Sequence, residues 1–145
     1  MSFASKVTWQ NEISHLRCNP HFNNKPRYDY ILVCTPNGVI FAQLLFIFTT
    51  ATEDRIDAWV LIQPLDAKVP HPSTRERDYQ LFRIRAMART SSRFISVKSI
   101  IRGVVVIPTH ITEGDYYVFD FLDDDIFLRV RALWKERGQG PSGQD

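Results

Sequence analysis

The chain has 145 residues, of which 44% are hydrophobic and 12% aromatic, a composition typical of a globular domain and not of a disordered or fibrous protein. A formal net charge of +2 is too small to indicate a partner by itself, and no apolar stretch reaches the about 20 residues that a membrane-spanning helix needs. Cys18 and Cys34 form no paired motif, and no secretory signal precedes them. The sequence therefore predicts an intracellular protein, with the nucleus as one location, in which Cys34 is a small buried residue and a disulfide is the less favoured alternative.

Residues 1–26 are expected to form an N-terminal arm that packs on the body of the protein. Trp9, Ile13 and Leu16 recur at the spacing of one helix face, so the arm is predicted to contain a short helix within Ser5–Leu16. Asn and Pro residues then provide turns before the body begins at residue 27.

Residues 27–137 are expected to form one β-rich domain. The strand signals are Tyr28–Cys34, Val39–Thr49 after a hairpin turn at Asn37-Gly38, Ala58–Ile62 before Pro64, Tyr79–Ala86, Phe94–Val97, Ile100–Ile107 and Tyr116–Phe121. A long loop is expected from Leu65 to about Asp78. In Tyr79–Ala86 the alternation is strict: Leu81, Arg83 and Arg85 point to one side, and Phe82, Ile84 and Ala86 point to the other.

The end of the chain is expected to be helical. Asp123-Asp124-Asp125 supplies a helix cap, and Ile126, Phe127, Val130, Leu133 and Trp134 form an apolar stripe behind it. Residues 138–145 are expected to be a disordered tail. The predicted fold class is mostly β: a small, partly closed barrel or bent antiparallel sheet of six to seven strands, with a short N-terminal helix and a C-terminal helix.

Charge is distributed unevenly along the chain. Between Arg75 and Arg102 there are eight basic and two acidic residues, a balance of +6, whereas Glu113–Asp125 has six acidic residues and no basic one. Arginine can bind phosphate or carboxylate through two parallel hydrogen bonds, so a basic strand face is a candidate surface for nucleic acid or an acidic partner. The alternative is that Arg83 and Arg85 form a solvated face or pair with aspartates. The candidate binding residues are Arg75, Arg77, Arg83, Arg85, Arg89 and Arg93.

Catalytic signatures are missing from the sequence. The histidines show no metal-ligand spacing, and there is no nucleophile elbow or phosphate-binding glycine loop, so no catalytic residue, cofactor or metal is assigned. Asp120, Asp123 and Asp125 are weak candidates for a divalent cation, because they lack the glycine and the closing glutamate of a calcium loop.

Several segments carry a family resemblance over about residues 27–131. The most specific are Ser99-Ile100-Ile101-Arg102-Gly103 and Asp125-Ile126-Phe127-Leu128-Arg129. In this region the chain resembles the β-rich C-terminal region of proteins of mushroom-forming fungi that is often fused to transposases of the Kyakuja–Dileera–Zisupton type. The resemblance implies no catalytic role, because the transposase core lies upstream, and it suggests a domesticated or excised domain. The strand order is also similar to bromo-adjacent-homology and SH3-like barrels, which often bind peptides or chromatin.

Three functions remain open on this evidence. The leading hypothesis is a non-enzymatic interaction module that binds DNA, RNA or an acidic protein segment, without a membrane role, using Arg83, Arg85 and the loop around His71–Arg77. The second is a self-associating domain that forms a homodimer through exposed strand edges or the oppositely charged segments. The third is a metal-dependent hydrolase that uses the aspartate cluster.

Overall fold

The computed structural model describes residues 3–9, 12–22, 25–120 and 123–137, and the side chains of 29–120 and 123–137. The chain forms two compact units: unit 1 comprises Met1–Asp66 and Ala86–Val104, and unit 2 comprises Ala67–Arg85 and Val105–Asp145. Residues 27–137, expected to form one domain, are thus distributed over both units. The predicted tail at 138–145 lies outside the described residues.

The mostly-β fold class is confirmed. The larger sheet has seven antiparallel strands in the order β7-β10-β9-β4-β5-β6-β8. Its strand β9 (Ile100–Pro108) contributes Ile100–Val104 to unit 1 and its last four residues to unit 2. The other strands of this sheet are β4 (Tyr30–Thr35), β5 (Gly38–Ala51), β6 (Ile56–Pro64), β7 (Arg83–Arg85), β8 (Arg93–Ser96) and β10 (Asp115–Phe119).

The N-terminal segment forms strands, so the predicted short helix within Ser5–Leu16 is wrong. β1 (Phe3–Trp9) pairs antiparallel with β2 (Glu12–Phe22), which pairs with β3 (Lys25–Tyr28) in a separate three-stranded sheet. The β1–β2 register joins seven residue pairs. Such pairing satisfies backbone groups along β1 and β2, whereas a helix this short is marginal in water unless tertiary packing supports it.

The hairpin between β4 and β5 is confirmed, with its turn one residue earlier than Asn37-Gly38. Thr35 pairs with Gly38, so Pro36 and Asn37 form the two-residue loop, and Gly38 adopts a φ of +125°. That backbone conformation favours glycine, which explains the residue at this position. Cys34, expected to be buried, is instead an exposed free thiol beside this turn, because the core of unit 1 ends before the hairpin turns.

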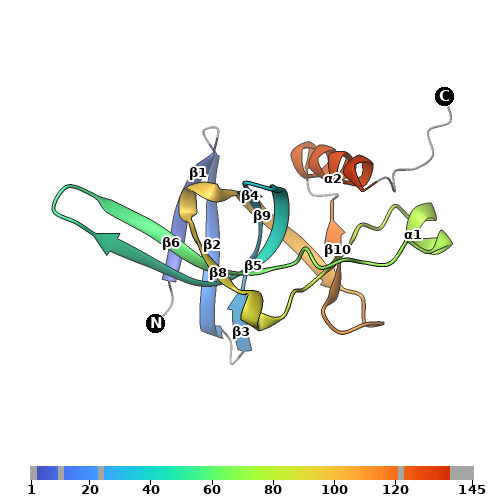
Figure 1. The fold of residues 1–145 in the computed structure, drawn as a ribbon, viewed down its shortest axis with the longest axis horizontal. Coiled ribbons are helices and arrows are strands. Elements are labelled where there is room, and N and C mark those ends of the chain that lie inside the picture. Colours follow the sequence, from blue (N-terminus) through green and yellow to red (C-terminus); the bar gives the residue numbers. More distant parts are fainter. Residues whose placement is uncertain (1–2, 10–11, 23–24, 121–122, 138–145) are drawn as a thin grey trace. The chain divides into compact units, whose positions relative to one another are not determined.

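The core of unit 1 is aliphatic. It gathers Ile31 and Val33 of β4, Ala42, Leu44 and Ile47 of β5, Val60 and Ile62 of β6, and Ile100 of β9. A β-bulge interrupts β5, since Leu44 pairs with Ile62 and Phe46 pairs with the next residue, Leu61, which leaves Leu45 as the extra residue. Beyond the bulge, β5 and β6 stay paired as far as Ala51 and Ile56 and extend as a long hairpin (Figure 1).

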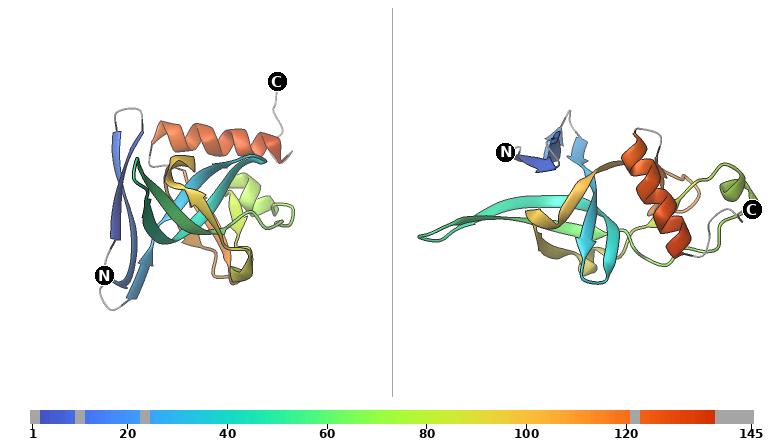
Figure 2. Two further views of the ribbon diagram at one scale, coloured as in Figure 1. Left: turned by 60° about the vertical axis from the view of Figure 1, so that its left-hand side comes forward. Right: turned by 90° about the horizontal axis from the view of Figure 1, so that it is seen from above.

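Unit 2 is a small sheet with one long helix. Its strands are β7, β10 and the end of β9, and its helices are α1 (Thr74–Asp78) and α2 (Asp124–Glu136), which is red in Figure 2. Ile126, Val130 and Trp134 of α2 are buried, and the Trp134 ring contacts Phe82 edge to face with centroids 5.4 Å apart. The predicted C-terminal helix is confirmed, and Asp123 caps it by accepting a hydrogen bond of 2.9 Å from the Ile126 amide.

The region before β7 differs from its prediction. Residues 74–78, expected to be part of a loop, form α1, whose N-cap is Ser73. Tyr79 follows this helix, and Gln80 has a φ of +55°, so the extended backbone begins only at Arg83. No helix within the described ranges is long and apolar enough to cross a membrane.

Candidate functional site

Arg83 and Arg85 lie on β7, as the alternating pattern predicts. Phe82, which precedes Arg83, and Ile84, which lies between the two arginines, are buried in unit 2. Both arginines are bound within the unit. Arg85 donates to both carboxylate oxygens of Asp115, from Nε at 2.6 Å and from Nη2 at 2.8 Å. The sequence left three interpretations open, namely a binding surface, a solvated face and pairing with aspartates, and the observed arrangement of Arg85 is pairing with an aspartate.

Arg83 links two buried carboxylates. Its Nη2 is 2.7 Å from Glu76 Oε1, and its Nη1 is 3.3 Å from Asp115 Oδ2. Its guanidinium also lies over the Tyr117 ring, 5.7 Å from the centroid. The Arg83 side chain is only 12% exposed, and the Asp115 side chain is fully buried.

This network is electrically balanced, with two arginines and two carboxylates. The hydrogen bond from Arg85 is the main cause that holds the pKa of Asp115 below its usual range, and the charges of Arg85 and Arg83 act in the same direction. Paired charges in a partly buried site satisfy one another and leave little for a ligand. Arg83 and Arg85 therefore contribute to the folded structure of unit 2, and a charged-ligand surface has to be built from other residues.

Arg75 and Arg77 lie on α1 in unit 2, where both are exposed. Between them Glu76 is buried, because its carboxylate turns toward Arg83. His71, in the loop before α1, is exposed. The predicted loop surface around His71–Arg77 thus keeps two charged side chains at the surface.

Arg89 and Arg93 belong to unit 1. Arg89 begins the short 3₁₀ helix η1 (Arg89–Ser91), and Arg93 begins β8. Both are exposed, as is Lys98 in the 3₁₀ helix η2 (Val97–Ser99), and none of the three has an ion-pair partner within the described part of the chain. The six predicted binding residues are therefore divided: four lie in unit 2 and two in unit 1.

Two of the three aspartate candidates have structural roles in α2. Asp123 caps α2, and Asp125 pairs with Arg129 at 2.9 Å one helical turn later. Asp120 is buried, and this desolvation raises the pKa of its carboxyl group. Among the residues that the structure describes, no group of three His, Cys, Asp or Glu side chains is placed to hold a metal ion.

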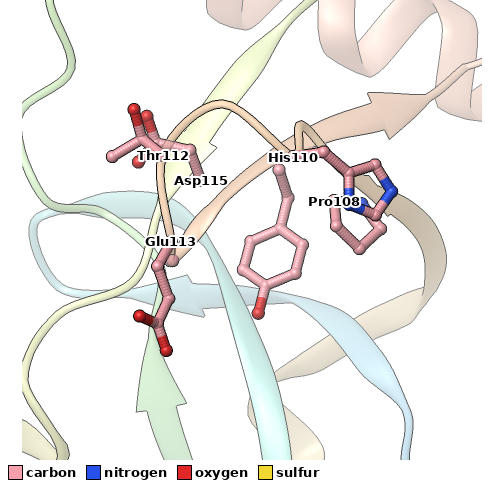
Figure 3. A pocket seen from close by; sticks show the side chains of 7 residues that line it. Pro108, His110, Thr112, Glu113 and Asp115 are labelled. Carbon is pink, nitrogen blue, oxygen red and sulfur yellow. The ribbon is translucent and has the colours of Figure 1, made fainter.

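An open pocket of about 330 Å³ lies in the loop between β9 and β10. In Figure 3, Glu113 stands on one side of it, and His110 and Pro108 stand on the other. Asp115 also lines it, but its carboxylate is bound by arginine. His110 is an exposed turn residue with a φ of +59°.

An aromatic surface on unit 1 is the main feature that sequence reasoning missed. Phe46, Phe48, Trp59, Leu61 and Phe94 lie on one face of β5, β6 and β8, and we call them the aromatic face. Phe94 is 62% exposed and Phe46 is 45% exposed. The apolar run Val39–Phe48 shows no alternation that would separate an inner from an outer side, so the sequence carries little signal for this face.

Comparisons with protein-family models, with curated proteins and with solved structures found no match for this chain. The resemblance to transposon-associated fungal proteins and to bromo-adjacent-homology barrels accordingly stays a prediction from the sequence.

Proposed function

We propose that the chain is a non-enzymatic interaction module that binds nucleic acid through unit 1. The observation that carries this proposal is the set of exposed cations Arg89, Arg93 and Lys98, which have no ion-pair partner in the described part of the chain. They stand in Ala86–Val104, the segment that belongs to unit 1, which contains no acidic residue. Exposed cations without a competing carboxylate are those that can exchange counterions for phosphates.

The proposal differs in one respect from the expectation based on β7. Arg83 and Arg85 are bound to Asp115 and Glu76, so they are assigned to folding, and Arg89 and Arg93 keep the binding role. An acidic protein segment would use the same cations. A competition experiment with a polyglutamate peptide distinguishes the two kinds of ligand, because this peptide lacks phosphates and bases.

Fluorescence anisotropy with labelled DNA oligonucleotides, single-stranded and duplex, tests the proposal. The triple variant Arg89→Gln/Arg93→Gln/Lys98→Gln is expected to lose most of the affinity at about 50 mM salt. If each cation contacts one phosphate, the logarithm of the association constant falls against the logarithm of salt concentration with a slope of about −2 for a single strand.

The matched control changes the same number of charges in unit 2. Arg75→Gln/Arg77→Gln/Lys135→Gln replaces three exposed cations, so its net charge equals that of the unit 1 variant. It is expected to bind nearly as well as the unaltered protein. Equal losses in both triple variants, or no salt-dependent binding by the unaltered protein, would refute the proposal.

Self-association is a second candidate function, and the exposed part of the aromatic face favours it. Contiguous exposed apolar surface commonly marks a site of protein contact. Light scattering over a range of concentrations measures this directly. A monomer at all concentrations would exclude a homodimer under those conditions.

A further inference from the structure

We infer that the nucleic acid bound by unit 1 is single-stranded and that its bases stack on the aromatic face. The inference rests on the proposed function and goes beyond it, because it names the form of the ligand and the side chains that the bases contact. Its basis is the geometry of β5, β6 and β8, which brings rings from separate parts of the sequence onto one side of the sheet.

Strand pairing places these residues in two rows. Phe46 of β5 is opposite Leu61 of β6, which is opposite Phe94 of β8. Residues directly opposite one another in an antiparallel sheet project from the same face. The next row, two residues along each strand, contains Phe48, Trp59 and Ser96 and so shares that face.

The opposite face of the same strands is the core of unit 1. Ile47 and Val60 alternate with the aromatic residues and are buried. Ile95 of β8 packs against the same core. The aromatic face is therefore the outer side of the sheet, where it is open to a ligand at Phe94.

The rings form a connected platform. Phe46 and Phe48 are stacked with centroids 6.1 Å apart, and Phe94 meets Phe48 edge to face at 5.5 Å. The Trp59 indole is fixed by a hydrogen bond of 3.1 Å from its Nε1 to Thr50 Oγ1. Contacts of this kind hold ring orientations before a ligand arrives, which lowers the entropy cost of binding.

Positive charge lies at the edge of this platform. β8 is the last strand of the sheet. Arg93 directly precedes Phe94 and is opposite Ile62, so it projects from the other side of β8 at the open edge, and Lys98 follows in η2. Charged residues on an edge strand also deter strand pairing between molecules, which explains the cations but not a ring that is 62% exposed. Rings with cations along the neighbouring sheet edge are the combination that proteins use for single strands, where bases stack and phosphates pair.

A duplex fits this surface poorly. Its bases are stacked on one another and present only their edges in the grooves, so flat rings on a sheet cannot reach the base faces. A single strand exposes those faces, and stacking on them tolerates any base sequence. The inference therefore predicts weak sequence preference.

The test uses the full chain and oligonucleotides of about 12 nucleotides, within the range of known single-strand sites. The unaltered protein is expected to bind oligo(dT) at least about tenfold more tightly than a duplex of equal length. Phe94→Ala and Phe94→Leu are both expected to lose about tenfold in affinity for oligo(dT), because leucine keeps apolar area but no ring face.

Two controls separate the outcomes. Leu128→Ala removes a side chain of α2 that is 65% exposed in unit 2, and it is expected to leave oligo(dT) binding unchanged. Thermal melting of every variant shows that it is folded. If the protein binds duplex and single strand equally well and Phe94→Ala does not change the affinity, the inference is overturned while the proposed function stands.

Two other results are equally decisive. Absence of binding to either form of DNA at low salt overturns the proposed function and this inference together. If the protein self-associates and Phe94→Ala converts it to a monomer without changing DNA affinity, the face is occupied by a second copy and the inference is wrong.

Discussion

Arg83 and Arg93 come from the same basic stretch of sequence, yet their surroundings differ. Arg83, in unit 2, is 12% exposed and bridges two carboxylates, whereas Arg93, in unit 1, is exposed at the start of β8. The difference arises from the neighbouring strand: β10 brings Asp115 beside β7, whereas β8 pairs with β6 at the end of the strand order. A run of arginines is thus not one surface, because each residue's role depends on the strand beside it.

The largest effect is expected at Asp115. Asp115→Ala removes the carboxylate that both arginines share, and breaking a buried ion pair in this way commonly costs about 3 kcal/mol of unfolding free energy or more. Urea unfolding measures the change. The control Asp125→Ala breaks an exposed pair with Arg129 and should cost under about 0.5 kcal/mol. A loss as small as that of the control would show that the Asp115 network does not support unit 2.

Replacing the two arginines compares the units directly. Arg83→Gln leaves Glu76 and Asp115 buried with less compensation, so we expect it to lower the unfolding free energy by about 2 kcal/mol. Arg93→Gln is expected to change it by less than about 0.5 kcal/mol, as is usual for surface substitutions. Similar melting temperatures for the two variants would contradict the distinction drawn between them.

The pH dependence of stability gives a smaller and more selective test. The pKa of Asp115 is lower in the folded protein than its ordinary value of 3.8, so the ionised form favours folding. This contribution is present above pH 3.8 and is lost as the pH falls through the lowered folded pKa. The Asp115→Asn variant should therefore lose less stability than the unaltered protein between about pH 4 and pH 2. If the unfolding free energies of the two proteins fell by the same amount over this pH range, Asp115 would not be the source of the acid sensitivity.

Elements with a local chemical signal could be predicted from the sequence. Asn37 and Gly38 predict a hairpin because glycine tolerates positive φ, and Asp123 predicts a helix start because its side chain can cap backbone amides. The alternation through Phe82 and Ile84 correctly gives the buried side of β7. In each case the information lies within a few residues of the feature.

Features that depend on distant partners could not be predicted. The alternation places Arg83 and Arg85 on one side, but it cannot indicate that a residue thirty positions later along the chain, Asp115, supplies the counter-charge. The helix α1 is different, because it has a local signal: Ser73 and Glu76 have the spacing of a capping box. The aromatic face depends on the pairing of three strands, which local patterns do not specify.

The bulge at Leu45 determines which residues of the β5–β6 hairpin face outward. Leu44 and Phe46 are two positions apart and would share a side in a regular strand, yet Leu44 is buried and Phe46 is 45% exposed. If the surplus residue were absorbed at the hairpin tip instead, the same amino acids would hide the phenylalanines and expose Ile47. The set of residues that face outward on the β5–β6 hairpin is therefore determined by the position of the extra residue in β5, so that related chains of nearly equal composition can present opposite surfaces.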